Sequence, residues 1–136
     1  MNTIRTVAAA LILVASGLMN SAAHAEGVQL GGVRRVDLLQ RDLSVAGREV
    51  LQVLVKFSPG IVAPRHSHPG EEIVYVVEGA LEYQLDGQPP VTVKAGESLF
   101  IPSGTAHAVK NVGSGDAAEL ATYIVEKGKP LVTLTK

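Results

Sequence analysis

The chain has 136 residues, with 12 Lys and Arg against 13 Asp and Glu, and it has no cysteine. This near-balance of charge gives no electrostatic case for binding nucleic acid or an anionic membrane. Disulfides and a lipid-modified N-terminal cysteine are excluded, and the length fits one small domain with a modest core.

Residues 1–25 have the three parts of a secretory signal peptide. Arg5 is the positive region, an apolar run extends from Val7 to Leu18, and Ala23-His24-Ala25 is a small-x-small cleavage site. The apolar run is short of the roughly twenty residues that a membrane span needs. We therefore expect a mature chain that begins at Glu26, is periplasmic or secreted, and does not associate with the membrane after cleavage.

The rest of the chain divides into an N-terminal arm over 26–47, a main domain over 48–126 and a C-terminal segment over 127–136. The arm holds a candidate edge strand over 33–39, in which the basic pair Arg34-Arg35 is interpreted as a solvated surface.

In the main domain, short apolar runs alternate with Gly, Pro and Asp-Gly turns and show no sustained helical period. This pattern predicts an all-β fold, a double-sheet jelly roll. Strands are expected over Val50–Phe57, Ile73–Val77, Ala80–Leu85, Val91–Lys94, Leu99–Ile101, Ala106–Val109 and Leu120–Val125, with a hairpin turn at Asp86-Gly87.

The run Ile73–Val77 is apolar at every position, so both of its faces should be covered. Packing within the jelly roll and a dimer contact on the outer face both remain open, and a homodimer is expected.

Three of the four histidines fall in two spaced patterns. In His66-Ser67-His68, the two imidazoles project to the same side of a strand. The turn Pro69-Gly70 follows, and Glu72 opens the next strand beside them, while His107 comes about forty residues later, after Pro102-Ser103-Gly104. A lone pair of histidines in a half-buried strand is usually only hydrogen-bonded, so the argument for a metal depends on all four side chains converging.

The spacing of these residues resembles the two motifs of the cupin superfamily over roughly residues 48–126. The matching positions are Gly60, His66, His68, Glu72 and Gly79 in the first motif, and Gly96, Pro102, His107 and Asn111 in the second. The resemblance implies a double-stranded β-helix (the RmlC-like cupin barrel) with a mononuclear metal centre, whose ligands would be His66, His68, Glu72 and His107.

Imidazole nitrogen and carboxylate oxygen both bind divalent first-row metals. Iron or manganese is favoured and nickel, copper or zinc is an alternative, because a metal acquired outside the cytoplasm depends on availability. Three imidazoles and one carboxylate leave positions open for water, dioxygen or substrate. A barrel that keeps these residues but works without metal is the competing interpretation.

Cupins include dioxygenases, lyases, decarboxylases, isomerases and non-catalytic binding proteins, so fold and metal do not choose among them. Apolar neighbours of the motif, namely Val74, Val76, Leu99, Ile101 and Val109, favour a dioxygenase that acts on a small organic molecule, with Glu72 as base as well as ligand. The alternatives are a non-catalytic small-molecule binder, a metal-dependent lyase, decarboxylase or isomerase, and a purely structural metal.

Strand alternation also assigns the remaining polar neighbours. Glu71 and Tyr75 should face away from the metal because they alternate with Glu72, and Arg65 should face outward because it precedes His66. Whether Tyr123 lines the pocket stays open.

Overall fold

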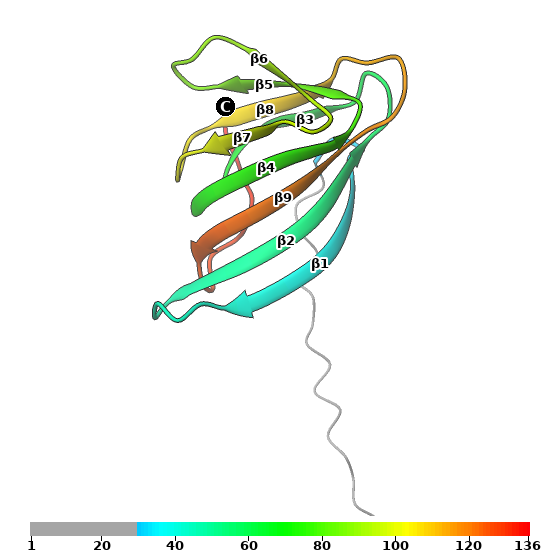
Figure 1. The fold of residues 1–136 in the computed structure, drawn as a ribbon. Helices are drawn as coiled ribbons and strands as arrows, with labels where there is room; N and C mark the ends of the chain where they lie inside the picture. The colour runs from blue at the N-terminus through cyan, green and yellow to red at the C-terminus, as the bar shows by residue number, and fades with distance from the viewer. Residues whose placement is uncertain (1–29) are drawn as a thin grey trace, which may run out of the picture.

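The computed structural model describes residues 30–136, and this part of the chain contains ten β-strands and no helix (Figure 1). The strands are β1 Arg34–Asp42, β2 Arg48–Phe57, β3 Val62–Ser67, β4 Gly70–Glu78, β5 Ala80–Leu85, β6 Val91–Lys94, β7 Ser98–Ile101, β8 His107–Asn111, β9 Ala117–Glu126 and β10 Thr133–Leu134. Among these residues no helix long and apolar enough to cross a membrane is found. The expected signal peptide lies outside the described residues.

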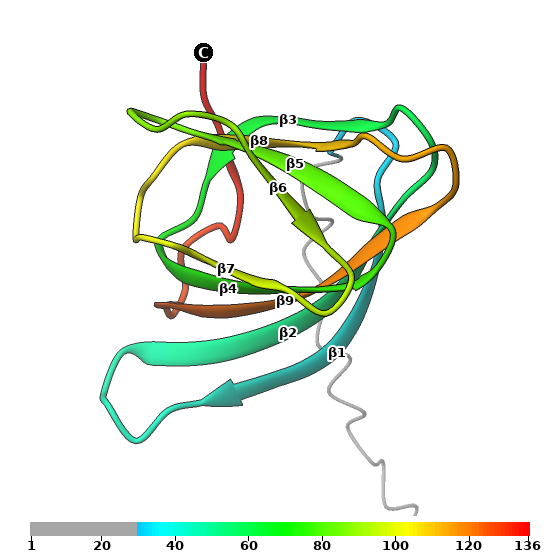
Figure 2. The same ribbon diagram turned by 45° about the horizontal axis from the view of Figure 1, so that its top comes forward.

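The strands form two five-stranded antiparallel sheets that face each other. One has the order β1-β2-β9-β4-β7 and the other β10-β3-β8-β5-β6, and Figure 2 shows them on opposite sides of the interior. Most neighbours within a sheet are not consecutive in sequence, as a jelly roll requires. The predicted all-β jelly roll is confirmed, and β1 occupies the edge position expected for the arm.

Period-two alternation builds the core between the sheets. Along β2, Val53, Val55 and Phe57 are buried, while the residues between them are more exposed. The opposite sheet contributes Leu81 and Tyr83 of β5, both fully buried. Each large apolar side chain removed from water in this way contributes about 1.5–3 kcal/mol.

Two motif residues prove to be structural. Asn111 donates from Nδ2 to the carbonyls of Phe57 (3.0 Å) and Gly115 (2.8 Å), and its Oδ1 accepts from the amide of Gly113 (2.9 Å). Gly79 has a φ of 70° and lies where a Cβ would come within 2.7 Å of the Asp116 carbonyl oxygen. Both residues fix the turns that join the two sheets.

The prediction that Ile73–Val77 is covered on both faces is wrong for the single chain. Val74 and Val76 are completely buried, but Ile73, Tyr75 and Val77 are 42–44% exposed on the outer face of their sheet. Packing within the jelly roll therefore accounts for only one face of this strand.

Candidate metal centre and its cavity

Three strands from both sheets bring the four predicted ligands together. His66 of β3 and His107 of β8 are paired directly across one sheet, and His68 follows β3. Glu72 enters from β4 in the facing sheet. All four side chains are buried, with exposures of 1–4%.

Each imidazole is held by a backbone carbonyl through its Nδ1 atom. The acceptors are the carbonyls of Pro64 for His66 (2.7 Å), Leu131 for His68 (2.7 Å) and Thr105 for His107 (3.0 Å). Because a carbonyl only accepts, Nδ1 carries a proton, and in the neutral ring Nε2 keeps its free lone pair. This is the tautomer that a histidine ligand needs.

The free donor atoms converge on one point. The His68 Nε2–Glu72 Oε2 distance is 3.1 Å and the His107 Nε2–Glu72 Oε2 distance is 3.3 Å, while donor atoms of the three histidines lie within 4.8 Å of one another. Two atoms that each bind one ion at about 2.1 Å stand roughly 3.0–3.4 Å apart. The spacing of these donors therefore fits a shared divalent metal ion.

The charges of the cluster also fit a metal. Burial and the neighbouring His107 charge lower the pKa of His66 from 6.5 to about 4, so its ring is neutral at pH 7. Burial would raise the pKa of Glu72, but the facing His107 and His68 outweigh it and lower that pKa to about 2. His68 Nε2 and Glu72 Oε2 have no hydrogen-bond partner although they are buried. A cation would remove this cost, since unpaired buried polar atoms are unfavourable.

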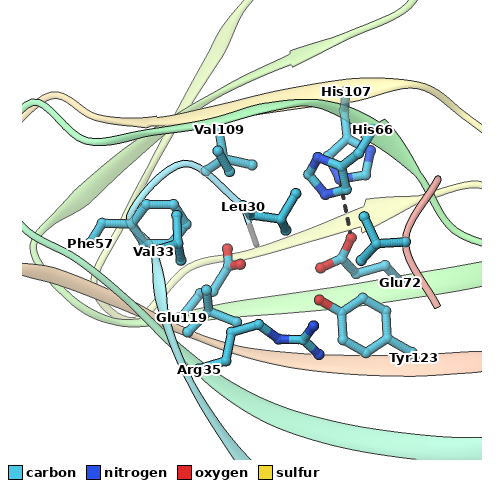
Figure 3. Close-up of a pocket in the computed structure, with 13 residues that line it drawn as sticks. Leu30, Val33, Arg35, Phe57, His66, Glu72, His107, Val109, Glu119 and Tyr123 are labelled. Atoms are coloured by element: carbon cyan, nitrogen blue, oxygen red, sulfur yellow. Dashed lines mark ion pairs between the residues drawn. The ribbon is translucent and has the colours of Figure 1, made fainter. Parts of the chain in front are cut away.

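The cluster opens onto an internal cavity, shown in Figure 3. Its walls include His66, His107 and Glu72 at one side and the apolar residues Leu30 and Val132. The volume of the cavity that is open to the centre of a water molecule is about 10 Å³. That is room for about one water, so a larger ligand needs the walls to move.

The apolar surroundings expected from the motif strands are only part of the lining, because three polar side chains also line the cavity: Arg35, Glu119 and Tyr123. Val109 is part of the wall, but the other four apolar residues named for this role (Val74, Val76, Leu99 and Ile101) pack in the core instead. Strand alternation could have found Glu119, because it lies four residues before Tyr123. The strand predicted over 120–125 begins one residue too late to include it.

Glu119 is a second buried carboxyl group, distinct from Glu72. Its side chain is 4% exposed and accepts a hydrogen bond from the hydroxyl of Tyr83. Burial, followed by the charge of Glu72, raises the pKa of Glu119 to about 8. Burial also raises the pKa of Tyr83, so its hydroxyl keeps its proton. Glu119 is therefore mostly protonated at neutral pH.

Tyr123 lies beside the metal ligands. It is paired with Glu72 between β9 and β4, its ring centroid is 4.7 Å from that of His68, and Figure 3 shows its hydroxyl directed toward the Glu72 carboxylate. Burial raises the pKa of Tyr123 well above its usual value, so it holds its proton.

The interpretation of Arg34-Arg35 as a solvated pair is wrong for Arg35. Arg35 is paired with Val55, whose side chain is 4% exposed in the core, so both point into the barrel. Arg34 alternates with it and is exposed.

A profile of the cupin domain matches residues 53–125, more than half of the chain. The protein belongs to the cupin family.

Curated relatives share parts of this cupin. Dimethylsulfoniopropionate lyase DddQ from Ruegeria pomeroyi is 38% identical over 61 residues, which are 44% of this chain and 30% of the lyase. Germin-like protein 1-1 from Oryza sativa subsp. japonica is 36% identical over 74 residues, 51% of this chain and 34% of that protein. The cupin thus matches about a third of the length of each.

Solved structures agree with the fold. The crystal structure of the same DddQ lyase superposes with a TM-score of 0.58 at 28% identity, covering 63% of this chain and 43% of the lyase. A recombinant oxalate oxidase in complex with glycolate superposes with a TM-score of 0.62 at 26% identity, covering 79% of this chain and 57% of the oxidase.

The C-terminal segment of the cupin closes the site, a role that the sequence did not reveal. β10 pairs with β3, with Leu134 opposite His66, and the preceding Leu131 supplies the carbonyl that holds His68. Val132 is part of the cavity wall.

The other polar neighbours lie as expected. Glu71 alternates with the buried Glu72 and is half-buried, and Tyr75 is 44% exposed on the outer face. Arg65 forms an ion pair with the exposed Asp86 at the surface.

Proposed function

We propose that this cupin is a mononuclear metal enzyme, an oxidoreductase of the dioxygenase type that acts on a small organic molecule. One observation carries the proposal: donor atoms of His66, His68 and His107 lie within 4.8 Å of one another, and Glu72 Oε2 lies 3.1 and 3.3 Å from the Nε2 atoms of His68 and His107. Iron or manganese is our first choice, with nickel, copper or zinc as alternatives. The similarity to oxalate oxidase supports an oxidative reaction.

A bound divalent ion would supply Lewis acidity and, if redox-active, electrons for reaction with dioxygen. The chain's own residues then handle substrate and protons. Tyr123 holds its proton beside Glu72 and can donate a hydrogen bond from its hydroxyl. Glu119, with a pKa raised to about 8 by burial and by Glu72, can accept or release a proton near neutral pH. The burial of these groups strengthens their interactions with a ligand.

A metal-dependent lyase is the second candidate, and a specific observation favours it. Tyr123, whose place was left open, and Glu119, which was not expected, add acid–base groups to the cavity, and proton transfer is what a lyase needs. The similarity to the DddQ lyase supports this alternative.

Metal content is the first test. The protein isolated from its own host without added metal should contain about one equivalent of a redox-active metal, measured by elemental analysis. His107→Ala and Glu72→Gln should each lose most of that metal, while Glu71→Gln, the matched change on the opposite face of β4, should keep it. Unchanged metal content in His107→Ala contradicts the four-ligand site.

Assays of turnover with and without oxygen distinguish the oxidoreductase from the lyase. Oxygen uptake by the metal-loaded protein on a panel of small enolic, aromatic and carboxylic compounds supports the oxidoreductase. Product formed equally well without oxygen supports the lyase. Tight binding of a compound without any product would make the protein a non-catalytic binder and refute both enzymatic proposals.

Export of the protein is proposed from residues 1–25 alone. The test is the mass of the protein recovered from the periplasm or the medium, which should begin at Glu26. A full-length chain retained in the cell contradicts it.

The proposed assembly is a homodimer through the outer face of the β1-β2-β9-β4-β7 sheet. Val36, Leu54, Leu120 and Tyr75 form one row across four strands of this sheet, and the adjacent row includes Ile73 and Phe100. Of these, Val36, Ile73, Tyr75 and Phe100 are 42–56% exposed. A contiguous apolar strip of this kind is typical of a protein interface.

Light scattering coupled to size-exclusion chromatography tests the assembly. Tyr75→Glu should give a monomer, and Val91→Lys, which changes a similarly exposed residue on the other sheet, should leave the dimer intact. A wild-type monomer contradicts the proposal.

A further inference from the structure

Arg35 brings a positive charge into the cavity that three of the predicted metal ligands line. Its cross-strand partner Val55 is paired in turn with Glu119, so Arg35 and Glu119 lie in one row on the inner face of the sheet, two strands apart. The Arg35 side chain is 22% exposed and shares the cavity wall with His66, His107 and Glu72. Figure 3 shows its guanidinium beside Tyr123, on the same side of the cavity as Glu119.

This guanidinium has no strong partner within residues 30–136. Asp37 Oδ1 is 3.9 Å away, and the Asp37 side chain is 68% exposed, so this ion pair is weak. None of the side-chain hydrogen bonds in the described part of the chain involves Arg35. Five donors in a fixed fork are therefore available to a ligand.

The cavity carboxyl groups do not neutralise this charge. Glu119 is mostly protonated and accepts from Tyr83, and Glu72 belongs to the metal cluster. With a divalent ion bound, the ion and Arg35 would carry three positive charges against the single negative charge of Glu72, which would favour an anion in the cavity. In either form, a planar guanidinium can bind a carboxylate through two parallel hydrogen bonds.

We propose that Arg35 is the specificity-determining residue of the site and binds the carboxylate of a small organic acid whose other end lies against the His66–His68–Glu72–His107 cluster. This inference rests on the proposed function for the metal but assigns the substrate class from Arg35. The acid must be short, because the guanidinium and the metal ligands line the same small cavity. The acid can enter only if side chains of the cavity wall, such as Leu30 and Val33, move aside.

Calorimetric titration with glycolate tests the proposal, with neutral glycolamide as the matched ligand and inorganic phosphate as the competing anion. Each is titrated into the full-length protein as isolated and after metal removal. We expect glycolate to bind more tightly than glycolamide and phosphate in both forms. Arg35→Met should weaken glycolate binding by about tenfold or more, because the charge-assisted hydrogen bonds are lost, and Arg35→Lys by less.

Arg34→Gln is the matched control, because it removes an adjacent positive charge that points outward. It should leave glycolate binding unchanged. Thermal unfolding and metal content should be unchanged in Arg35→Lys, which keeps the test valid if Arg35→Met is unstable.

The outcomes separate this inference from the proposed function. Equal glycolate affinity in wild type and both Arg35 variants, or no glycolate binding in either form of the protein, overturns the role of Arg35. Tighter binding of phosphate than of glycolate overturns the carboxylate assignment. Arg35-dependent glycolate binding by a protein that holds no metal or shows no turnover supports the inference and refutes the proposed enzyme.

Discussion

Glu119→Gln should stabilise the metal-free protein at neutral and alkaline pH and have little effect in acid. Glu119 is fully surrounded by protein and is held by the Tyr83 hydroxyl. Burial and the charge of Glu72 raise its pKa from 4.5 to about 8. Glutamine has nearly the same shape, keeps an acceptor for Tyr83 and cannot ionise.

The sign and size of the effect follow from proton linkage. A carboxyl group with a raised pKa in the folded state is protonated there while the unfolded chain is already ionised. Glu119 therefore does not lower the free energy of unfolding below pH 4.5. Between pH 4.5 and about pH 8 it lowers the free energy of unfolding by about 1.4 kcal/mol for each pH unit. At pH 7 the cost is roughly 3 kcal/mol, which the substitution removes.

Urea unfolding of the chelator-treated protein between pH 4.5 and 8.5 measures this effect. The stability difference between Glu119→Gln and wild type should rise with pH, and the exposed Glu78→Gln serves as the control for the same substitution outside the cavity. The difference isolates Glu119 because other titrating groups are common to both proteins. A Glu119→Gln difference that does not change with pH refutes the assignment of a protonated Glu119.

Three further changes test other parts of the structure. Burial and the charge of His107 lower the pKa of His66 from 6.5 to about 4. The free energy of unfolding of the metal-free protein should therefore fall by about 3 kcal/mol as the pH is lowered from 6.5 to 4. Urea unfolding should show a smaller fall in His66→Asn. Asn111→Ala should cost about 2–4 kcal/mol in urea unfolding, because it leaves three backbone groups without partners. Gly70→Ala should abolish soluble folded protein, since its Cβ would lie 2.1 Å from the Ile124 carbonyl oxygen, whereas Gly115→Ala, with nothing within 4 Å, should fold with an unchanged circular dichroism spectrum.

The all-β fold could be predicted from the sequence, and so could the approach of His66, His68, Glu72 and His107 to one another. Alternation of apolar and polar residues marks strands directly, and the spacing of the histidines survives folding because alternate strand residues share a face. The bounds of the strands were accurate to a few residues, but β10 and the early start of β9 carry no strong apolar signal.

The other side of the cavity was harder to predict. A charged residue such as Arg35 or Glu119 is exposed in most proteins, so composition argues against an inward position. Only the register of β1 against β2 shows that Arg35 faces inward, and register depends on tertiary pairing. The carbonyl of Leu131 is a backbone group and has no signature in the sequence at all.

The placement of β1 and β10 has a consequence for comparing cupins. The segment that matches the family, residues 53–125, supplies every predicted ligand of the ion. Leu30, Val33 and Arg35 come from before it, and Leu131 and Val132 come from after it, yet all five lie around those ligands. The flanks thus complete a cavity whose remaining walls, Glu119 and Tyr123 among them, come from the matched segment. Exchanging these flanks between two cupins would exchange the residue proposed to bind the ligand carboxylate, Arg35. The matched segment produced alone would lack the Leu131 carbonyl that holds the His68 ring.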